Sequence, residues 1–170
     1  MVYAMGSSIP PDHARPARRH RRSGAFTLLE VAIVLGIVSV LAAIAGPAYQ
    51  GHLERARAKT VVLDIRWLEE EIAAFELEWE SFPPSLDAIG ADGRRDPWDN
   101  PYVYLRIADS GKPGKGTLRK DKFLNPLNSD YDLYSKGPDG DSKTPLSAPV
   151  SHDDIIRAGD GDFVGVAEDY

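Results

Sequence analysis

A run of 20 residues from Phe26 to Ala45 is largely apolar, and its only charged residue is Glu30. As an α-helix that rises 1.5 Å per residue, this run is about 30 Å long, which matches the hydrocarbon core of a bilayer. A carboxylate in hydrocarbon costs a few kcal/mol, and a plain membrane anchor gains nothing in return. The run therefore predicts a membrane-inserted helix whose glutamate pairs with another copy of the chain.

The residues before this run are basic. Residues 1–25 hold five arginines and one aspartate, are rich in Pro and Ser, and show no apolar period, so we expect a leader held in the cytoplasm. The same flank precedes uncut membrane anchors and secretory signal peptides. Ala43-Ile44-Ala45 satisfies the small-x-small rule of signal peptides, which would make Gly46 the first mature residue. Charge pattern alone leaves these alternatives open.

A second helical pattern follows Pro47. Apolar residues recur there at alternating spacings of four and three, at Val61, Ile65, Leu68, Ile72, Phe75 and Trp79. Phe82-Pro83-Pro84 stops the pattern. We expect one helix from Phe26 to about Glu80, kinked at Pro47, and we expect Trp67, Trp79 and Trp98 to be buried in the core.

The remainder of the chain predicts short strands. Candidate strands are residues 101–107 (PYVYLRI), 131–135 (YDLYS) and 162–167 (DFVGVA), while the segment DSGKPGKGTLRKDK reads as a flexible, locally basic connection. The fold class is therefore α+β, with a small antiparallel sheet laid on the amphipathic half of the helix. The chain contains no cysteine, so a disulfide cannot hold it together outside the cytoplasm, and a bound metal could.

The segment GAFTLLEVAIVLGIVSVLAAIAGPAY resembles the start of type IV pilins and pseudopilins. The resemblance implies that a prepilin peptidase cuts between Ala25 and Phe26 and methylates the new amine, which makes Glu30 the fifth mature residue. The residue before the cut is usually Gly in that family; a cut after Gly24 would make Glu30 the sixth. It further implies a long helix packed on a small sheet.

Electrostatics independently gives Glu30 a role in assembly. The cut creates a positive α-amine at Phe26, and in a staggered bundle the amine of one chain approaches Glu30 of the next. We therefore expect three parts: residues 1–25, a cytoplasmic leader that is removed; residues 26–47, a transmembrane and assembly helix; and residues 48–170, a periplasmic pilin-like globular domain.

The C-terminal segment concentrates aspartates. Turns alone explain many Asp-Gly pairs, and the segment is no EF-hand, because Lys143 stands where an oxygen ligand belongs. However, YDLYSKGPDGD followed by DDI is similar to the C-terminal calcium loop of the major pseudopilins of type II secretion, and DPWDNPYVYL is similar to a second motif of theirs. The resemblance implies calcium held by Asp139 and Asp154, with Asp153 possible and the backbone carbonyl of Lys136 contributing.

The charge balance and the lack of catalytic motifs argue against nucleic-acid binding and against an enzyme. Residues 26–170 hold 20 − 5 = 15 basic and 26 − 1 = 25 acidic side chains, which argues against nucleic-acid binding. No nucleophile, base or phosphate-loop pattern indicates an enzyme.

We therefore expect a structural subunit of a type II secretion-like pseudopilus that polymerises through its N-terminal helix to promote protein export. Expected partners are further copies, minor pseudopilins, the prepilin peptidase and an inner-membrane assembly platform. We expect a single-pass protein of the bacterial inner membrane with a periplasmic C-terminal domain. The alternatives are a subunit of an extracellular type IV pilus for adhesion, motility or DNA uptake, and a monomeric secreted or anchored calcium-binding module.

Overall fold

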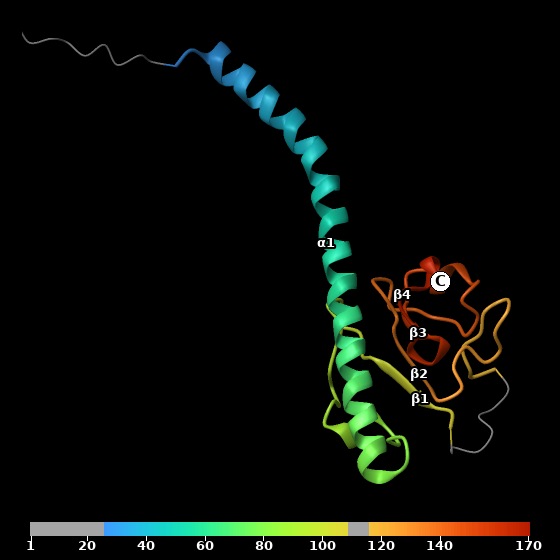
Figure 1. Cartoon of the computed structure of the whole chain (residues 1–170). Helices are drawn as coiled ribbons and strands as arrows, with labels where there is room; N and C mark the ends of the chain where they lie inside the picture. Colours follow the sequence, from blue (N-terminus) through green and yellow to red (C-terminus); the bar gives the residue numbers. More distant parts are fainter. Residues whose placement is uncertain (1–25, 109–115) are drawn as a thin grey trace, which may run out of the picture. The chain divides into compact units, whose positions relative to one another are not determined.

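The computed structural model describes residues 26–108 and 116–170. The chain divides into two compact units, Met1–Ala43 and Ile44–Tyr170, and a single α-helix, α1 (Leu28–Trp79), crosses the division (Figure 1). The leader predicted for residues 1–25 lies outside the described residues. The helix confirms the expectation of one element from Phe26 to about Glu80, within two residues at its start and one at its end.

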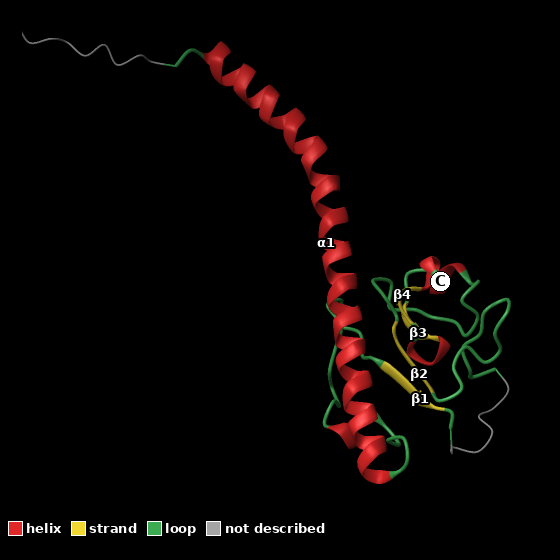
Figure 2. Cartoon of the chain, viewed as in Figure 1, coloured by secondary structure: helices red, strands yellow, loops and turns green. Residues whose placement is uncertain are grey.

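The second unit adds a four-stranded antiparallel sheet to its part of α1. Its strands stand in sequence order, with short 3-10 turns between and after them (Figure 2). The strands are β1 (Val103–Arg106), β2 (Tyr131–Ser135), β3 (Ile155–Ala158) and β4 (Phe163–Val166). Tyr104 stands opposite Leu133, and Ile156 stands opposite Tyr134 and Gly165. This arrangement confirms the predicted α+β fold.

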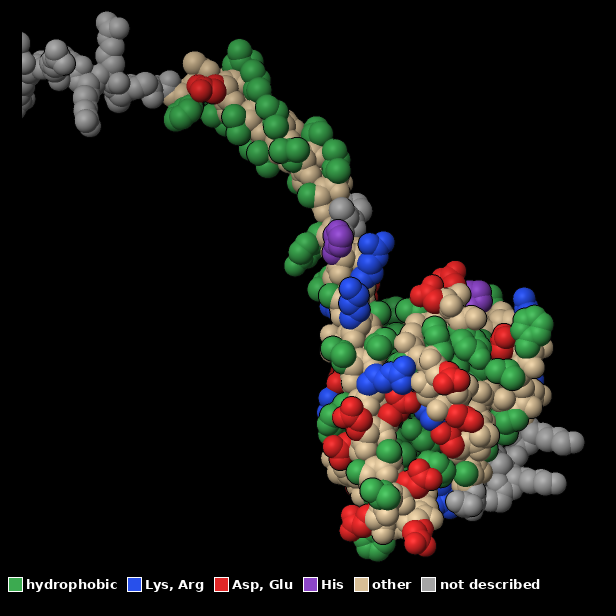
Figure 3. Space-filling model, viewed as in Figure 1, with side chains coloured by type: hydrophobic (Ala, Val, Ile, Leu, Met, Phe, Trp, Pro, Cys, Tyr) green, Lys and Arg blue, Asp and Glu red, His purple; other side chains and the backbone are tan. Residues whose placement is uncertain are grey.

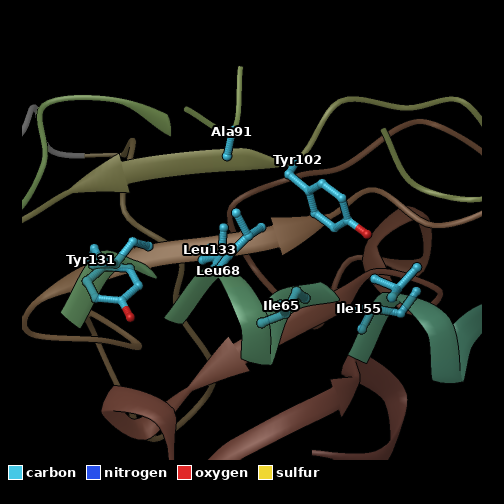
Figure 4. Close-up of a cluster of buried hydrophobic side chains, with 9 residues drawn as sticks. Ile65, Leu68, Ala91, Tyr102, Tyr131, Leu133 and Ile155 are labelled. Carbon is cyan, nitrogen blue, oxygen red and sulfur yellow. The ribbon is translucent and has the colours of Figure 1, made fainter. Parts of the chain in front are cut away.

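The main core lies between α1 and one face of the sheet. Val61, Ile65, Leu68 and Ile72 are fully buried, as their spacing predicts, because residues four and three apart share one helix face. From the other side Tyr131, Leu133 and Ile155 complete the cluster (Figure 4). A smaller apolar cluster is formed by Leu127, Leu146, Ile156, Ala158 and Ala167.

Strand β3 was not predicted from the sequence. Its four residues are all buried, and adjacent Ile155 and Ile156 belong to the two different apolar clusters. Successive strand residues point to opposite faces, so a strand buried on both faces shows no alternation of apolar and polar residues. The short run IIRA therefore carries no period-two signal.

Two further expectations were wrong in part. Trp79 is 62% exposed and stacks on Phe75, and Trp67 is 37% exposed and lies under the guanidinium of Arg94, so neither belongs to the core. Trp98 packs against the core and is partly buried. The connection between β1 and β2 is not simply a flexible basic segment. In its described part Arg119 is 2% exposed, and Lys120 forms a parallel bridge with Pro145.

Candidate assembly and cation-binding sites

The first turn of α1 is closed by Thr27. The Oγ1 atom of Thr27 accepts a hydrogen bond from the backbone N–H of Glu30 at 3.1 Å, and the Thr27 carbonyl accepts from Val31 at 3.2 Å. Thr27 is thus the N-cap and Glu30 the third helical residue, which is the T-x-x-E spacing of a capping box. Sequence reasoning missed this role, although the motif stands in the sequence.

The apolar run that follows is not covered by any other described part of the chain. Every side chain described from Phe26 to Gly46 is exposed, including Leu28 at 91% and Ile44 at 68%. The run is long and apolar enough to cross a membrane. The Ser39 hydroxyl is satisfied within the helix, because its Oγ donates to the Leu35 carbonyl at 2.7 Å. Its environment must therefore come from lipid or from other chains.

All four residues predicted to act at this end, Ala25, Phe26, Glu30 and Pro47, remain predictions. Ala25 lies outside the described residues, so the structure does not address cleavage before Phe26, whose side chain is 78% exposed. Pro47 falls within α1, and the kink expected there is likewise untested. Glu30 occupies the exposed first turn of the helix, where a carboxylate interacts favourably with the helix dipole.

The C-terminal loop brings Asp139 and Asp153 together. The backbone N–H of Asp139 donates to Asp153 Oδ2 at 3.3 Å, and Asp139 Oδ1 accepts from Asp141 N at 2.8 Å. Gly137 makes this approach possible: its φ is +65°, and a Cβ there would lie 2.2 Å from the Asp153 carbonyl oxygen. Lys136, the expected carbonyl donor, directly precedes this glycine. The turn thus brings the backbone of Asp139 to the carboxylate of Asp153.

Burial and a neighbouring negative charge both act on the Asp153 carboxylate. Burial raises the pKa of Asp153, the hydrogen bond from Asp139 opposes the rise, and the Asp139 charge adds to it. A bound cation would relieve the repulsion between the two carboxylates.

Asp154 points into a different environment. Its Oδ2 accepts from Arg119 Nη2 at 2.5 Å and from Ser142 Oγ at 2.7 Å, and Arg119 Nη1 donates to Ser142 Oγ at 2.7 Å. The guanidinium also lies over the Tyr134 ring, 4.0 Å from its centroid. Burial raises the pKa of Asp154, while the Arg119 charge opposes the rise. Asp154 Oδ1 is buried without a hydrogen-bond partner.

The donors fit a hard cation only in part. Calcium prefers six to eight oxygen ligands, and the loop offers two adjacent carboxylates, backbone carbonyls and the free Oδ1 of Asp154. However, within residues 26–108 and 116–170 no three His, Asp or Glu side chains converge on one point. Arg119 already neutralises Asp154, and sequence reasoning missed it because an arginine in a Lys- and Gly-rich connection looks solvated.

A second ionic cluster joins α1 to the sheet. Arg157 on β3 donates from Nε to Glu69 Oε1 at 2.7 Å and from both terminal nitrogens to Asp130, at 2.7 and 2.6 Å. Its guanidinium lies 4.0 Å from the centroid of the Tyr131 ring. Arg157 is 4% exposed, so this cluster fixes the register between helix and sheet from inside.

The chain is similar to known proteins over most of its length. Residues 20–46 match the family model described as the prokaryotic N-terminal methylation motif. The type II secretion system core protein G of Klebsiella pneumoniae is 31% identical over 144 residues, which cover 79% of this chain and 94% of that protein. Its counterpart in Dickeya chrysanthemi is 30% identical over 156 residues, with coverages of 79% and 86%.

The chain is also similar to a competence protein. Competence protein ComGC of Halalkalibacterium halodurans is 34% identical over 100 residues, which cover 59% of this chain and 87% of that protein. No solved structure matches the chain.

Proposed function

This chain belongs to the type II secretion system core protein G family, within the pilins and pseudopilins, and from that membership we propose how its residues act. It is a structural subunit of a pseudopilus, anchored as a single-pass membrane protein. The subunit polymerises through its N-terminal helix, with its C-terminal domain in the periplasm, and growth of the filament promotes protein export. We assign it no catalytic role.

The exposed apolar part of α1 carries this proposal. From Phe26 to Gly46 every described side chain is exposed, so the helix needs lipid before assembly and neighbouring helices after it. A prepilin peptidase cuts before Phe26, and the new amine of one copy pairs with Glu30 of the next. Minor pseudopilins and an inner-membrane platform complete the expected partners.

The T-x-x-E spacing of a capping box offers a purely local reason for Glu30, and two substitutions separate the roles. Glu30→Gln keeps a residue that suits the third position of a capping box but removes the charge. Thr27→Ala removes the cap and keeps the charge. Charge pairing predicts that Glu30→Gln inserts and is cleaved normally but forms at least tenfold less filament, while Thr27→Ala assembles nearly as the parent chain does.

Both variants should be compared for membrane insertion, cleavage and filament yield, with Ser39→Ala as a control on the same exposed helix. Normal filaments from Glu30→Gln, or a loss confined to Thr27→Ala, would contradict the pairing. N-terminal sequencing of protein from cells supplies an independent test. A methylated Phe26 supports the proposal, whereas a start at Gly46 indicates signal-peptide cleavage.

For the C-terminal loop we propose a calcium ion held by Asp139, Asp153 and the Lys136 carbonyl. Asp154 can add only its free Oδ1, because Arg119 and Ser142 hold the other oxygen. Calcium would neutralise the adjacent carboxylates and close the turn around Gly137. Asp139→Asn should abolish the rise in melting temperature on adding calcium, whereas Asp162→Asn, an exposed aspartate outside the loop, should not. An unchanged calcium response of Asp139→Asn would remove the site.

The similarity to a competence protein supports one alternative, a type IV pilus-like filament for DNA uptake. The two assignments share the assembly helix and differ in the product. Long surface fibres in cells that produce the chain at its natural level would favour the alternative; export defects without such fibres would favour the pseudopilus.

A further inference from the structure

Between the apolar run and the core, α1 carries three basic side chains on one face: His52, Arg55 and Lys59, here called the basic row. Their spacings are three and four residues, and each residue turns the helix by about 100°, so the three point to the same side. All three side chains are exposed. Val61, which is fully buried, follows Lys59 by two residues and points to the opposite side. The basic row therefore faces away from the core.

The one acidic side chain within this stretch is already held by other groups. Glu54 accepts a hydrogen bond from Arg57 Nη1 at 2.9 Å on one carboxylate oxygen and from Trp98 Nε1 at 2.8 Å on the other. Neither Arg55 nor Lys59 forms an ion pair with a side chain of residues 26–108 or 116–170. The described part of the chain thus leaves the two positive charges of the basic row without a counter-ion.

The basic row begins close to the end of the apolar run. His52, Arg55 and Lys59 lie about 10, 15 and 21 Å beyond Ala45 along the helix. Figure 3 shows purple and blue side chains on the helix just past its green apolar stretch. Each headgroup layer of a bilayer is about 5 to 8 Å deep. Because long basic side chains reach toward the interface, Arg55 can meet phosphate groups, and Lys59 lies within about one Debye length of them, 8 to 10 Å.

The charge on α1 changes sign farther from the apolar run. The exposed acidic side chains of the helix, Glu70, Glu76 and Glu78, all lie beyond the basic row. An anionic surface attracts basic and repels acidic side chains, and its potential falls off within about one Debye length. The order of base and then acid along the helix therefore matches an anionic membrane surface at the end of the apolar run.

The orientation of the chain in the membrane does not account for the basic row. Lys and Arg near the cytoplasmic end of a span favour insertion with that end inside, and residues 1–25 already supply five arginines there. Basic side chains at the other end of the span oppose the same orientation. They need a reason of their own, and contact with lipid headgroups supplies one.

We propose that the basic row binds the phosphate groups of anionic phospholipids in the membrane that holds the apolar run, before the chain enters a filament. The proposal rests on the membrane anchorage in the proposed function. Arg55 donates its N–H groups to a phosphate as a fork, and Lys59 adds a second charge at longer range. Because the row occupies one face, the contact draws that face of α1 toward the bilayer surface.

Local lipid composition around the row tests the proposal. Ala56 is exposed beside Arg55, and the chain has no cysteine, so Ala56→Cys places a single fluorophore there in the full-length protein. The protein is inserted into vesicles of phosphatidylglycerol in an excess of phosphatidylcholine, and a headgroup quencher is placed on one lipid or the other. Phosphatidylglycerol should quench more strongly. Arg55→Gln should lower the ratio of the two quenching efficiencies about two- to fivefold at low salt, and Lys59→Gln less than about twofold.

Two control variants separate the basic row from total charge. Arg57→Gln removes a positive charge at nearly the same height, but on the side where Arg57 pairs with Glu54. Arg66→Gln removes an exposed one about 30 Å beyond Ala45. Both should change the ratio clearly less than Arg55→Gln does. Asp153 lines one groove with Arg55, and its negative charge acts alike in all these variants. An effect of either control equal to that of Arg55→Gln would overturn the proposal.

Two further outcomes would also overturn it. One is equal quenching by the two lipids in the parent chain. The other is an Arg55→Gln chain that keeps its preference for phosphatidylglycerol but forms fewer filaments, because that result assigns the row to acidic side chains of another copy. Normal filaments without any lipid preference would refute this contact and leave the proposed function intact. A lipid preference in a parent chain that never assembles would refute the proposed function alone.

Discussion

The two halves of α1 differ in what surrounds their apolar side chains. From Leu28 to Ala43 every side chain is exposed within its own unit, whereas in the globular unit Val61, Ile65 and Leu68 are fully buried. Both halves are rich in Leu, Ile and Val. The same residue types therefore stabilise the fold in one half and leave it unaffected in the other, where they are reserved for lipid or other chains.

The contrast has a cause in the sequence pattern. Polar side chains interrupt the second half at helical spacing and confine its core-facing residues to one face, so a sheet can cover that face completely. The first half is apolar on all sides, and no single face of it could be satisfied by one small sheet. Helices of this kind are buried all round or lie in a membrane.

The sharpest way to break this comparison is to truncate one leucine in each half. Leu68→Ala removes a fully buried side chain and should lower the free energy of unfolding of the globular unit by about 4 kcal/mol. Leu35→Ala removes a side chain that is 61% exposed and should leave that free energy unchanged. Urea unfolding of full-length protein in mild detergent, followed by far-UV circular dichroism, measures both. Similar losses would show that the halves form one cooperative core.

The Arg157 cluster should be the next largest contribution to holding the second half on the sheet. Arg157→Met leaves Asp130 without a guanidinium and Glu69 with that of Arg66 alone. It should cost about 3 kcal/mol, because the arginine is nearly buried while the two carboxylates keep some contact with water. Arg66→Met also loses a contact with Glu69, but Arg66 is exposed, so the expected cost is below about 1 kcal/mol. Equal losses of stability from the two substitutions would mean that the Arg157 ion pairs contribute no more than exposed ones do.

The sequence predicted those elements whose signal is periodic. Helix α1, β1, β2 and β4 follow from spacing and strand-forming residues, and the fold class follows from them. Strand β3 did not, because Ile155 and Ile156 are buried on opposite faces, and neither did the partners of Arg119 and Arg157. Those partners lie 35 and 88 residues away in the chain, at Asp154 and Glu69, and no local pattern reports such a contact.

The candidate sites divide in the same way. Sequence motifs singled out Glu30 and the aspartates of the C-terminal loop as candidates, because each of these motifs is a short, local stretch of the chain. The ion pair between Arg119 and Asp154 forms only in the folded sheet, which brings the connection after β1 against the segment before β3. A pattern of aspartates therefore shows which oxygens are available but does not show which of them another side chain already uses.

Trp79 lies at the end of α1, where the spacing of the core-facing residues continues but the side chain is exposed. It therefore separates the effect of spacing from the effect of burial. Trp79→Ala should cost only about 1 kcal/mol, chiefly the stacking on Phe75 at 5.9 Å between ring centroids. Ile72→Ala, two turns earlier on the same face and fully buried, should cost about 3 kcal/mol. Thermal melts of both variants in detergent check the difference. A cost for Trp79→Ala as large as that for Ile72→Ala would mean that the last turn is covered in solution.

The smallest expected effect concerns an exposed contact between the second half of α1 and the turn at Gly161. Arg66 on α1 donates to the Gly161 carbonyl at 2.9 Å, and the turn that holds Gly161 is fixed by Asp160, whose carboxylate accepts two hydrogen bonds of 2.6 Å from Ser129. Desolvation raises the pKa of Asp160, but the bonds from Ser129 outweigh it, and the pKa lies below its ordinary value of 3.8. The charged form is therefore favoured by folding.

A lowered carboxyl pKa stabilises the fold above the unfolded value, and this contribution is lost as the pH falls through the folded pKa. Asp160→Asn should accordingly be less stable than the parent chain by a few tenths of a kcal/mol at pH 7, since the group is exposed. The difference should shrink below about pH 3.8, where the unfolded carboxyl takes up its proton first. Urea midpoints of both chains from pH 7 to pH 2.5 measure this. A difference that stays constant over the whole range would assign the effect to the shape of the turn, because only a charge contribution can disappear with protonation.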